Sequence, residues 1–222
     1  MLLAKFIPAL LCAAAMTYRF LAAALLATFS APVLSQVSIL APQAPAQKED
    51  LVPVAIDTSL GRIVVALDRG RAPVTTANFL HYVDLHRFDG QNFYRAMHME
   101  GGGGLIQGGI TTDARKLFPP IAHEPTTQTG LHNVTGAISM ANAGPGTAKA
   151  DFFILLSDMP GLDANGPGGD SNGFAAFGHV TEGMDVVKKI FESSVSPTKG
   201  EGPMKGQMLD PQIKILHAER VK

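Results

Sequence analysis

The sequence predicts a mostly β protein, a closed antiparallel β-barrel capped by two α-helices. Short apolar segments, several of them alternating with polar residues, recur along the chain and are separated by Gly- and Pro-rich connections. Only two longer segments have the apolar spacing of a helix that buries one face. Many short strands with only two helices are typical of a barrel that closes on itself.

The domain begins with a predicted β-hairpin and a helix. Segments 52–56 and 63–67 alternate apolar and less apolar residues, and Thr58–Gly61 supplies a turn between them. Pro73 suits the first turn of a helix, because its missing N–H would have no helical partner there. We expect this helix to run to about His86.

Short strands fill the middle of the chain and its end. They are predicted at 92–95, 105–107, 136–141 and 152–157, with a final strand at Gln212–Glu219. A second helix is expected to open at Thr181 and Glu182. Its buried stripe would be formed by Met184, Val187 and Ile190 or Phe191.

Residues 1–35 predict a secretory signal peptide. Lys5 precedes one apolar run, Arg19 separates it from a second, and Ser35 supplies a small residue for cleavage. Met16 begins a complete signal by itself and is an alternative start. The rival interpretation is an uncleaved anchor, but neither apolar run reaches the roughly 20 residues that span a bilayer. No stable membrane span is therefore expected after cleavage.

The remaining composition is that of one folded domain with a leader. Residues 36–50 are rich in Pro, Ala and Gln and are predicted to be an extended linker, and 51–222 to be the domain. The net charge is -1 and no basic run is present, which argues against a nucleic-acid partner. Cys12 is the only cysteine and lies in the predicted signal, so a mature protein would have no disulfide.

Several segments together resemble the cyclophilin family of peptidyl-prolyl cis-trans isomerases. They are Phe93–Arg95, Leu105–Gly109, Gly136–Pro145, Asp151–Leu155 and Phe177–Val187. The resemblance covers most of the predicted domain and implies an eight-stranded barrel with a groove on its outside. It also implies that the chain binds proline-containing polypeptides.

Arg95 is the candidate catalytic residue. Amide resonance holds an X-Pro bond planar with a barrier of about 18–20 kcal/mol. In the twisted form the prolyl nitrogen gains a lone pair, and a guanidinium can hydrogen-bond that nitrogen or the preceding carbonyl. The family's catalytic arginine lies in a Phe-His-Arg motif, and this chain has Phe93-Tyr94-Arg95. Taken alone, Arg95 would be interpreted as a surface salt-bridge residue.

The resemblance also assigns the substrate-binding groove. Leu105, Phe153 and Leu162 would line the proline slot, and Gln107 would hold the substrate backbone. Ala141–Asn142 would pair with the peptide as a strand does. Without the joint pattern, Phe153 and Leu162 would be interpreted as core residues.

Several positions of the groove depart from the family pattern. Tyr94 and Phe174 each stand where the family has a histidine, and Asp151 stands where it has a glutamine. Gly104 replaces a phenylalanine, and Gly161 replaces an aromatic residue. Gly104 is expected to remove one wall of the slot, whereas Phe174 still offers an apolar wall. The loss at Gly161 implies weak cyclosporin binding.

Residues 98–103 form an insertion relative to the usual spacing between the arginine and the glutamine. Gly101–Gly104 should be flexible. They are interpreted as the tip of a hairpin, with a lid over the groove as the alternative.

Other motifs predict no additional chemistry. Gly169–Gly173 matches G-x-S-x-G but lacks the strand and helix that a nucleophile elbow needs. Asp163, Asn165, Asp170 and Asn172 fail the EF-hand spacing and suit turns. His81 and His86 do not share a helix face. No metal site and no cofactor are predicted.

Three hypotheses about function follow. The first is an exported, monomeric prolyl isomerase that assists folding in the bacterial periplasm. The second is a binding module of the same fold that grips proline segments but isomerises them poorly, as Tyr94, Gly104 and Asp151 suggest. The third is a membrane-tethered version of either, in which residues 1–35 persist.

Overall fold

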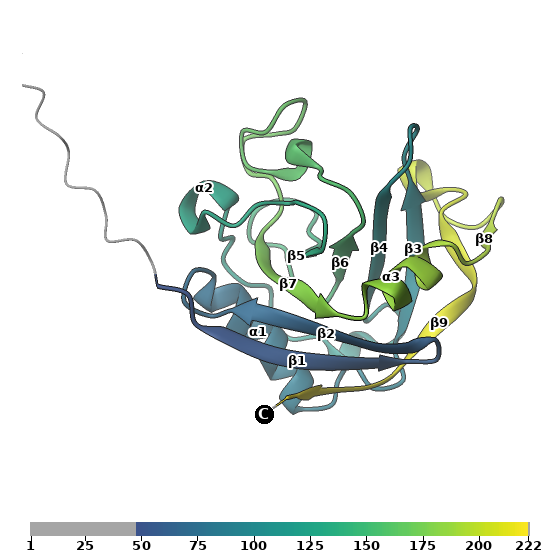
Figure 1. Cartoon of the computed structure of the whole chain (residues 1–222), viewed down its shortest axis with the longest axis horizontal. Helices are drawn as coiled ribbons and strands as arrows, with labels where there is room; N and C mark the ends of the chain where they lie inside the picture. Colours follow the sequence, from purple (N-terminus) through teal and green to yellow (C-terminus); the bar gives the residue numbers. More distant parts are fainter. Residues whose placement is uncertain (1–47, 222) are drawn as a thin grey trace, which may run out of the picture. The chain divides into compact units, whose positions relative to one another are not determined.

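The computed structural model describes residues 48–221, so the predicted signal peptide and most of the predicted linker lie outside the described residues. The described part forms one antiparallel sheet in the order β1-β2-β7-β5-β6-β4-β3-β9-β8, and the further pairing of β1 with β9 closes it (Figure 1). Eight strands therefore form the barrel, and the two-residue β8 is added at its edge. The predicted fold class is confirmed.

The element bounds agree broadly with the expected ones. The strands are β1 (Leu51–Thr58), β2 (Gly61–Asp68), β3 (Asn92–His98), β4 (Gly104–Gly109), β5 (Ala137–Met140), β6 (Phe152–Leu155), β7 (Ala176–Glu182), β8 (Val195–Ser196) and β9 (Met208–Arg220). The helices are α1 (Pro73–Asp84), α2 (Thr126–Thr129) and α3 (Met184–Phe191). The four-residue α2 is additional to the two predicted helices.

The second helix begins later than predicted. Thr181 and Glu182 end strand β7, which the sequence pattern did not reveal, and Gly183 separates it from α3 with a φ of 82°. A side chain at Gly183 would collide with the Arg62 carbonyl, so this close approach requires glycine. The fully buried stripe of α3 is Val186, Val187 and Ile190, with Met184 and Phe191 only half-buried.

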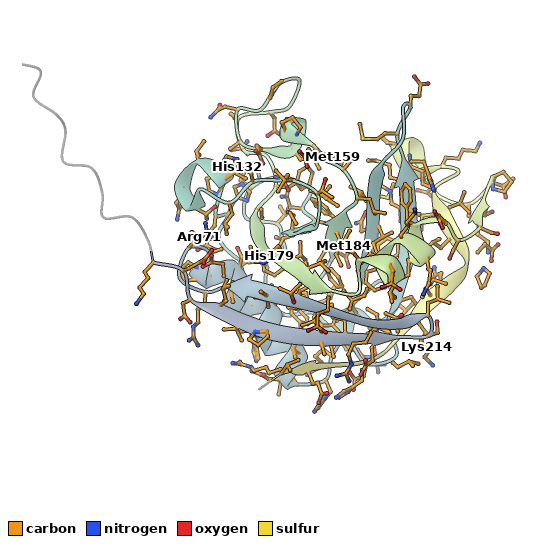
Figure 2. The ribbon with its side chains drawn as sticks, in the orientation of Figure 1. Arg71, His132, Met159, His179, Met184 and Lys214 are labelled. Atoms are coloured by element: carbon orange, nitrogen blue, oxygen red, sulfur yellow. The ribbon has the colours of Figure 1, made fainter. Side chains whose placement is uncertain are left out.

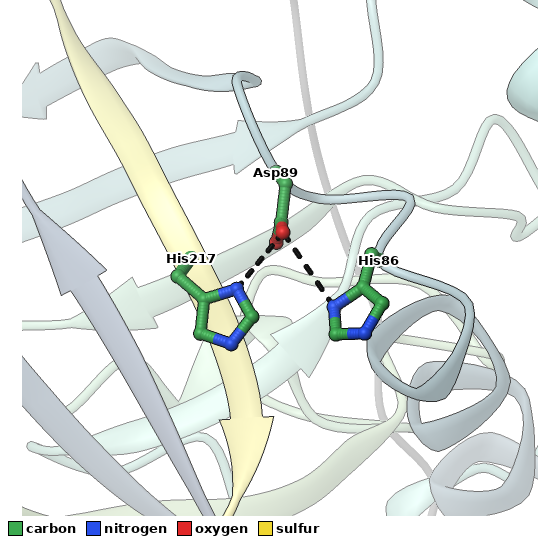
Figure 3. A group of neighbouring side chains, drawn as sticks. All are labelled: His86, Asp89 and His217. Atoms are coloured by element: carbon green, nitrogen blue, oxygen red, sulfur yellow. Dashed lines mark hydrogen bonds and ion pairs between the residues drawn. The ribbon is translucent and has the colours of Figure 1, made fainter.

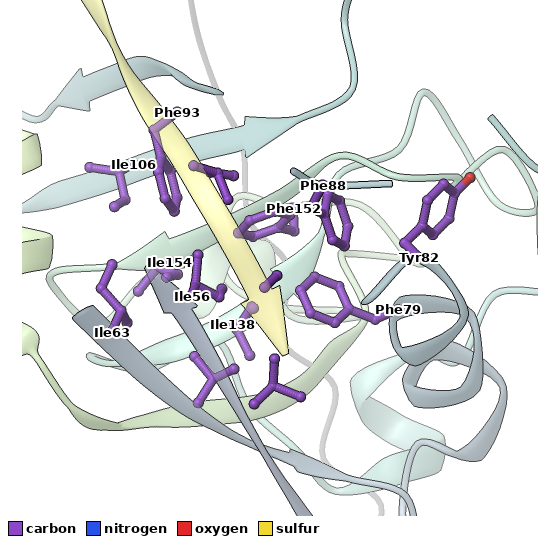
Figure 4. Close-up of a cluster of buried hydrophobic side chains, with 14 of the residues drawn as sticks. Ile56, Ile63, Phe79, Tyr82, Phe88, Phe93, Ile106, Ile138, Phe152 and Ile154 are labelled. Atoms are coloured by element: carbon purple, nitrogen blue, oxygen red, sulfur yellow. The ribbon is translucent and has the colours of Figure 1, made fainter. Parts of the chain in front are cut away.

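Aromatic and branched side chains fill the barrel (Figure 4). Phe79 of α1 meets Phe152 of β6 edge to face, with ring centroids 5.2 Å apart, and both are essentially buried. Val187 of α3 belongs to the same cluster. Because this interior is packed with side chains, any binding site must lie on the outside of the barrel.

Two segments outside the barrel wall are held by local bonds. Gly101–Gly103 form the turn of the β3–β4 hairpin, where the Met99 N–H donates to the Gly103 carbonyl (3.1 Å). Asp50, at the end of the predicted linker, accepts from the Arg69 N–H (2.8 Å) and pairs with its guanidinium (2.8 Å). No helix within residues 48–221 is long and apolar enough to cross a membrane.

Candidate active site

A β-bulge places two consecutive side chains of β3 on the outer face of the barrel. The pairing register with β4 shifts between Phe93, opposite Gly108, and Arg95, opposite Gln107. Phe93 points into the core, whereas Tyr94 and Arg95 both reach the side chain of Gln107. Regular alternation would have turned one of them inward. The bulge therefore builds the polar side of the site.

Arg95 and the predicted proline slot lie along one row across three strands. Gln107 of β4 stands opposite Arg95 of β3 on one side and Phe153 of β6 on the other. The Nη1 of Arg95 donates to the Oε1 of Gln107 (2.8 Å). Phe153 is 3% exposed and lies beside this pair. The structure thus brings the candidate catalytic and slot residues together.

The slot belongs to a second hydrophobic cluster, separate from the barrel core. Its buried members include Leu105 and Phe153, and the half-buried Ala141, Leu162 and Phe174 pack against it. Phe153 and Phe174 meet edge to face, with centroids 5.5 Å apart and planes at 82°. The cluster also contains Met97 and Met159, which sequence reasoning missed.

Gly104 was expected to remove one wall of the proline slot, but the structure shows a different situation. A Cβ there would collide with the Met97 carbonyl and lie 2.9 Å from the ring of Phe191 in α3. A side chain on this backbone would therefore point at α3. The slot wall expected to be missing at Gly104 is supplied in this chain by Met97, opposite Leu105.

A groove with a volume of about 570 Å³ runs beside the slot. Its lining includes the predicted residues Tyr94, Gln107, Ala141, Asn142 and Asp151. The Nδ2 of Asn142 is buried and has no hydrogen-bond partner among residues 48–221. An unpaired buried donor is costly, so this amide is suited to a ligand carbonyl.

A directional chain of hydrogen bonds crosses the groove. Arg95 donates to Gln107, and the Nε2 of Gln107 donates to the Tyr94 hydroxyl (2.7 Å). The Asp151 carboxylate is close enough to the Tyr94 hydroxyl for each group to influence the pKa of the other. The Ile110 N–H donates to Oδ1 of Asp151 (3.0 Å). The hydrogen-bonded chain therefore runs from the Arg95 cation to the Tyr94 hydroxyl, with the Asp151 carboxyl group nearby.

Burial shifts the pKa values of the ionisable groups at the groove. Desolvation raises the pKa of Asp151 to about 6, although the donors at Ile110 and Tyr94 oppose the rise. Desolvation, together with the nearby Asp151 charge, also raises the pKa of Tyr94 well above its usual range. Burial lowers the pKa of Arg95. The groove is thus a place where the protonation of Asp151 changes near physiological pH.

Two further residues belong to the site and were not found from the sequence. Gln207, just before β9, accepts from the Nε of Arg95 (2.8 Å) and donates to the Pro203 carbonyl (2.9 Å). Met204 lines the groove. No local pattern marks them, because only the pairing of β3 with β9 brings this segment to Arg95.

Comparison with known proteins decides the family. Residues 53–220 match the family model described as cyclophilin type peptidyl-prolyl cis-trans isomerase/CLD. The chain belongs to this family. Peptidyl-prolyl cis-trans isomerase A of Dickeya dadantii is 35% identical over 173 residues, which cover 76% of this chain and 84% of that protein. The cyp18 isomerase of Streptomyces antibioticus is 36% identical over 151 residues, covering 66% and 87%.

Solved structures agree on the fold. A crystal structure of a Cryptosporidium parvum cyclophilin type isomerase has a TM-score of 0.62 and 21% identity, covering 78% of this chain and 99% of that one. Family membership and the curated relatives identify this cyclophilin as a peptidyl-prolyl cis-trans isomerase. The isomerase hypothesis is therefore preferred to the binding-module hypothesis.

Proposed function

We propose that this cyclophilin isomerises X-Pro bonds by binding proline against Phe153 while Arg95 stabilises the twisted amide. The observation that carries the assignment is the fixed position of Arg95, held at Nη1 by Gln107 and at Nε by Gln207 (2.8 Å each). A guanidinium has five N–H donors, so three remain for the substrate.

The environment of Arg95 makes those remaining donors effective. Its head is partly buried beside the apolar slot, where a hydrogen bond to a developing lone pair is stronger than in water. A hydrogen bond to a charged group contributes roughly 1.5–3 kcal/mol, which is about 10- to 100-fold in rate. The rest of the acceleration comes from tighter binding of the twisted form by the slot.

The substrate class is a polypeptide segment that contains proline. The apolar surface of Leu105, Phe153 and Leu162 suits a pyrrolidine ring, and Gln107 and the free Asn142 amide suit the flanking backbone. The Cryptosporidium parvum isomerase has also been solved in the presence of the dipeptide Ala-Pro, with a TM-score of 0.60 to this chain. That dipeptide belongs to the substrate class proposed here.

A rate measurement tests the role of Arg95. We would measure cis-to-trans isomerisation of a short X-Pro peptide by the full chain, by Arg95→Ala and by Arg69→Ala. Arg69 is an exposed arginine paired with Asp50 and serves as the matched control. We expect kcat/KM to fall at least about tenfold in Arg95→Ala only. Equal rates in Arg95→Ala and wild type would contradict the assignment. Saturable peptide binding without acceleration by wild type would favour a binding module.

We further propose that the protein is exported to the periplasm and there assists protein folding. The support is the signal-like residues 1–35, with their positive start, apolar runs and small residue at the end. Intact mass of the protein purified from the periplasmic fraction is the test. A mass that begins after Ser35 is expected. Retention of residues 1–35 would instead support the membrane-tethered form.

A further inference from the structure

Two histidines and a carboxylate converge at one point of the surface, on the loop after α1 and on β9 (Figure 3). The Nδ1 of His217 lies 2.8 Å from Asp89 Oδ2, and the Nδ1 of His86 lies 3.5 Å from the same oxygen. One ligand atom from each residue lies within 4.8 Å of the others. Both rings thus turn the same nitrogen toward one carboxylate oxygen.

The backbone holds this arrangement in an unusual way. His86 has a φ of 52°, one of two positive values among the non-glycine residues described. Such a conformation is uncommon outside glycine and is often found where a side chain must be aimed. The Asp89 carboxylate is fixed from its other oxygen, because the Ala218 N–H donates to Oδ1 (3.1 Å). Oδ2 is therefore the oxygen that faces the two imidazole rings.

The donor set has a definite chemical preference. Zn²⁺ binds imidazole nitrogens and carboxylate oxygens at about 2.0–2.2 Å in a tetrahedron, so its ligand atoms are about 3.3 Å apart. The separations of 2.8 and 3.5 Å bracket that value. Imidazole suits zinc, copper and nickel, whereas magnesium and calcium prefer all-oxygen sites. We propose that His86, Asp89 and His217 form a binding site for a divalent cation of the zinc type.

A cation at this site would take the place of a proton on His217. The Nδ1 of His217 shares a hydrogen bond with Asp89 Oδ2 (2.8 Å), so a cation bound to both atoms would replace that proton, while Nε2 lies 3.7 Å from Glu219 Oε2. Asp57 is a further acidic neighbour of His217. Arg62 pairs with Asp57 (2.7 Å) and lies 3.7 Å from Glu219, so the surrounding negative charge is partly balanced.

Protons compete with the cation at this site. The Asp89 carboxylate, with smaller help from Glu219 and Asp57, raises the pKa of His217. Asp84, paired with Arg220, lies near His86. Because a coordinating imidazole must be neutral, protonation of His217 weakens binding of the cation.

The site lies outside the groove. None of its three residues lines the groove, and His217 lies on β9 beyond Lys214, which pairs with Asn92 at the first residue of β3. A bound cation would therefore tie the loop after α1 to the last strand. It would not touch the isomerase chemistry, so binding and catalysis can be tested separately.

The test is Zn²⁺ binding by the full chain, measured by isothermal titration calorimetry near pH 7.5. The variants are His86→Ala, Asp89→Asn and His217→Ala, and the matched control is His132→Ala. His132, labelled in Figure 2, has a side chain 61% exposed, as His86 has, and pairs with Asp163 at 2.7 Å, but among the described residues it belongs to no group of three possible metal ligands. Mg²⁺ serves as the cation control.

We expect one Zn²⁺ per chain, with affinity at least about tenfold weaker in His86→Ala than in His132→Ala or wild type. His86→Ala removes an exposed loop side chain and keeps the fold, and an unchanged isomerase rate verifies this for each variant. Absence of saturable binding by wild type at about 100 μM Zn²⁺, or equal affinity in wild type and His86→Ala, would overturn the proposal. So would equal binding of Mg²⁺, because an imidazole site discriminates against it.

Discussion

The two halves of the groove differ in how they tolerate change. The apolar slot was expected to lose surface at Gly104 and Gly161, yet a hydrophobic cluster forms because Met97, Met159 and Phe174 supply surface. Dispersion and burial are not directional, so any side chains of suitable volume can build such a wall.

The polar half behaves differently. Tyr94 and Asp151 lie close together, and Tyr94 is joined through Gln107 to Arg95 by hydrogen bonds. Hydrogen bonds require a donor, an acceptor and a direction, so one substitution leaves a neighbour unpaired unless a second compensates it. The difference shows that the slot requires side chains of suitable total volume, whereas the polar half requires matched hydrogen-bond donors and acceptors.

The largest expected effect breaks the slot. Phe153→Ala removes a side chain that is 3% exposed, and we expect the free energy of unfolding to fall by about 3–5 kcal/mol. Phe174→Ala, on the half-buried rim of the same cluster, should cost clearly less. Urea denaturation of the two variants checks this order. Equal losses of unfolding free energy in the two variants would show that Phe153 is not the buried centre of the slot.

The next largest effect is a pH dependence of stability that arises from Asp151, in the polar half of the groove. The raised pKa of Asp151 means that the folded state holds this proton more tightly than the unfolded chain does. Stability is therefore lost as the pH rises from about 4 to about 6, by about 2–3 kcal/mol in total, and is level above that. In Asp151→Asn this loss should vanish. Denaturation of both proteins at pH 4, 5, 6 and 7 gives the difference, and parallel curves would refute the assignment.

Tyr94→Phe tests connectivity without changing volume. It removes the acceptor of the Gln107 amide, which is buried, and should cost about 1–3 kcal/mol of stability. Tyr82→Phe is the matched control, because its hydroxyl accepts from the Phe118 N–H outside the groove (2.8 Å). Both variants should lose stability, but only Tyr94→Phe should slow isomerisation. A similar isomerisation rate in Tyr94→Phe and Tyr82→Phe would mean that the hydrogen bonds from Tyr94 through Gln107 to Arg95 are not needed for catalysis.

The smallest effect concerns the second support of Arg95. Gln207→Ala leaves the bond to Gln107 intact, so kcat/KM should fall only about fivefold, as expected for about 1 kcal/mol. The double variant with Gln107→Ala should lose more than the sum of the single losses in free energy, because the guanidinium is then unsupported. Additive losses would indicate that each amide acts on the substrate separately.

The sequence by itself determined the elements whose signals are local. Alternation marked the hairpin of β1 and β2, Pro73 marked the start of α1, and short motifs marked Arg95, Gln107 and Phe153 as a joint pattern. Each of these depends on residues within a few positions of one another, where periodicity and turn preferences act directly. Strand β7 was missed because its last residues resemble a helix start.

Only the tertiary structure decided which distant residues meet. The bulge turns Tyr94 outward beside Arg95, the pairing of β3 with β9 brings Gln207 to the guanidinium, and closure of the barrel places His217 against Asp89. These contacts depend on strand register, which is set by the packing of the whole sheet and by no local segment. Motifs therefore predicted the candidate residues, and the fold determined what holds them in position.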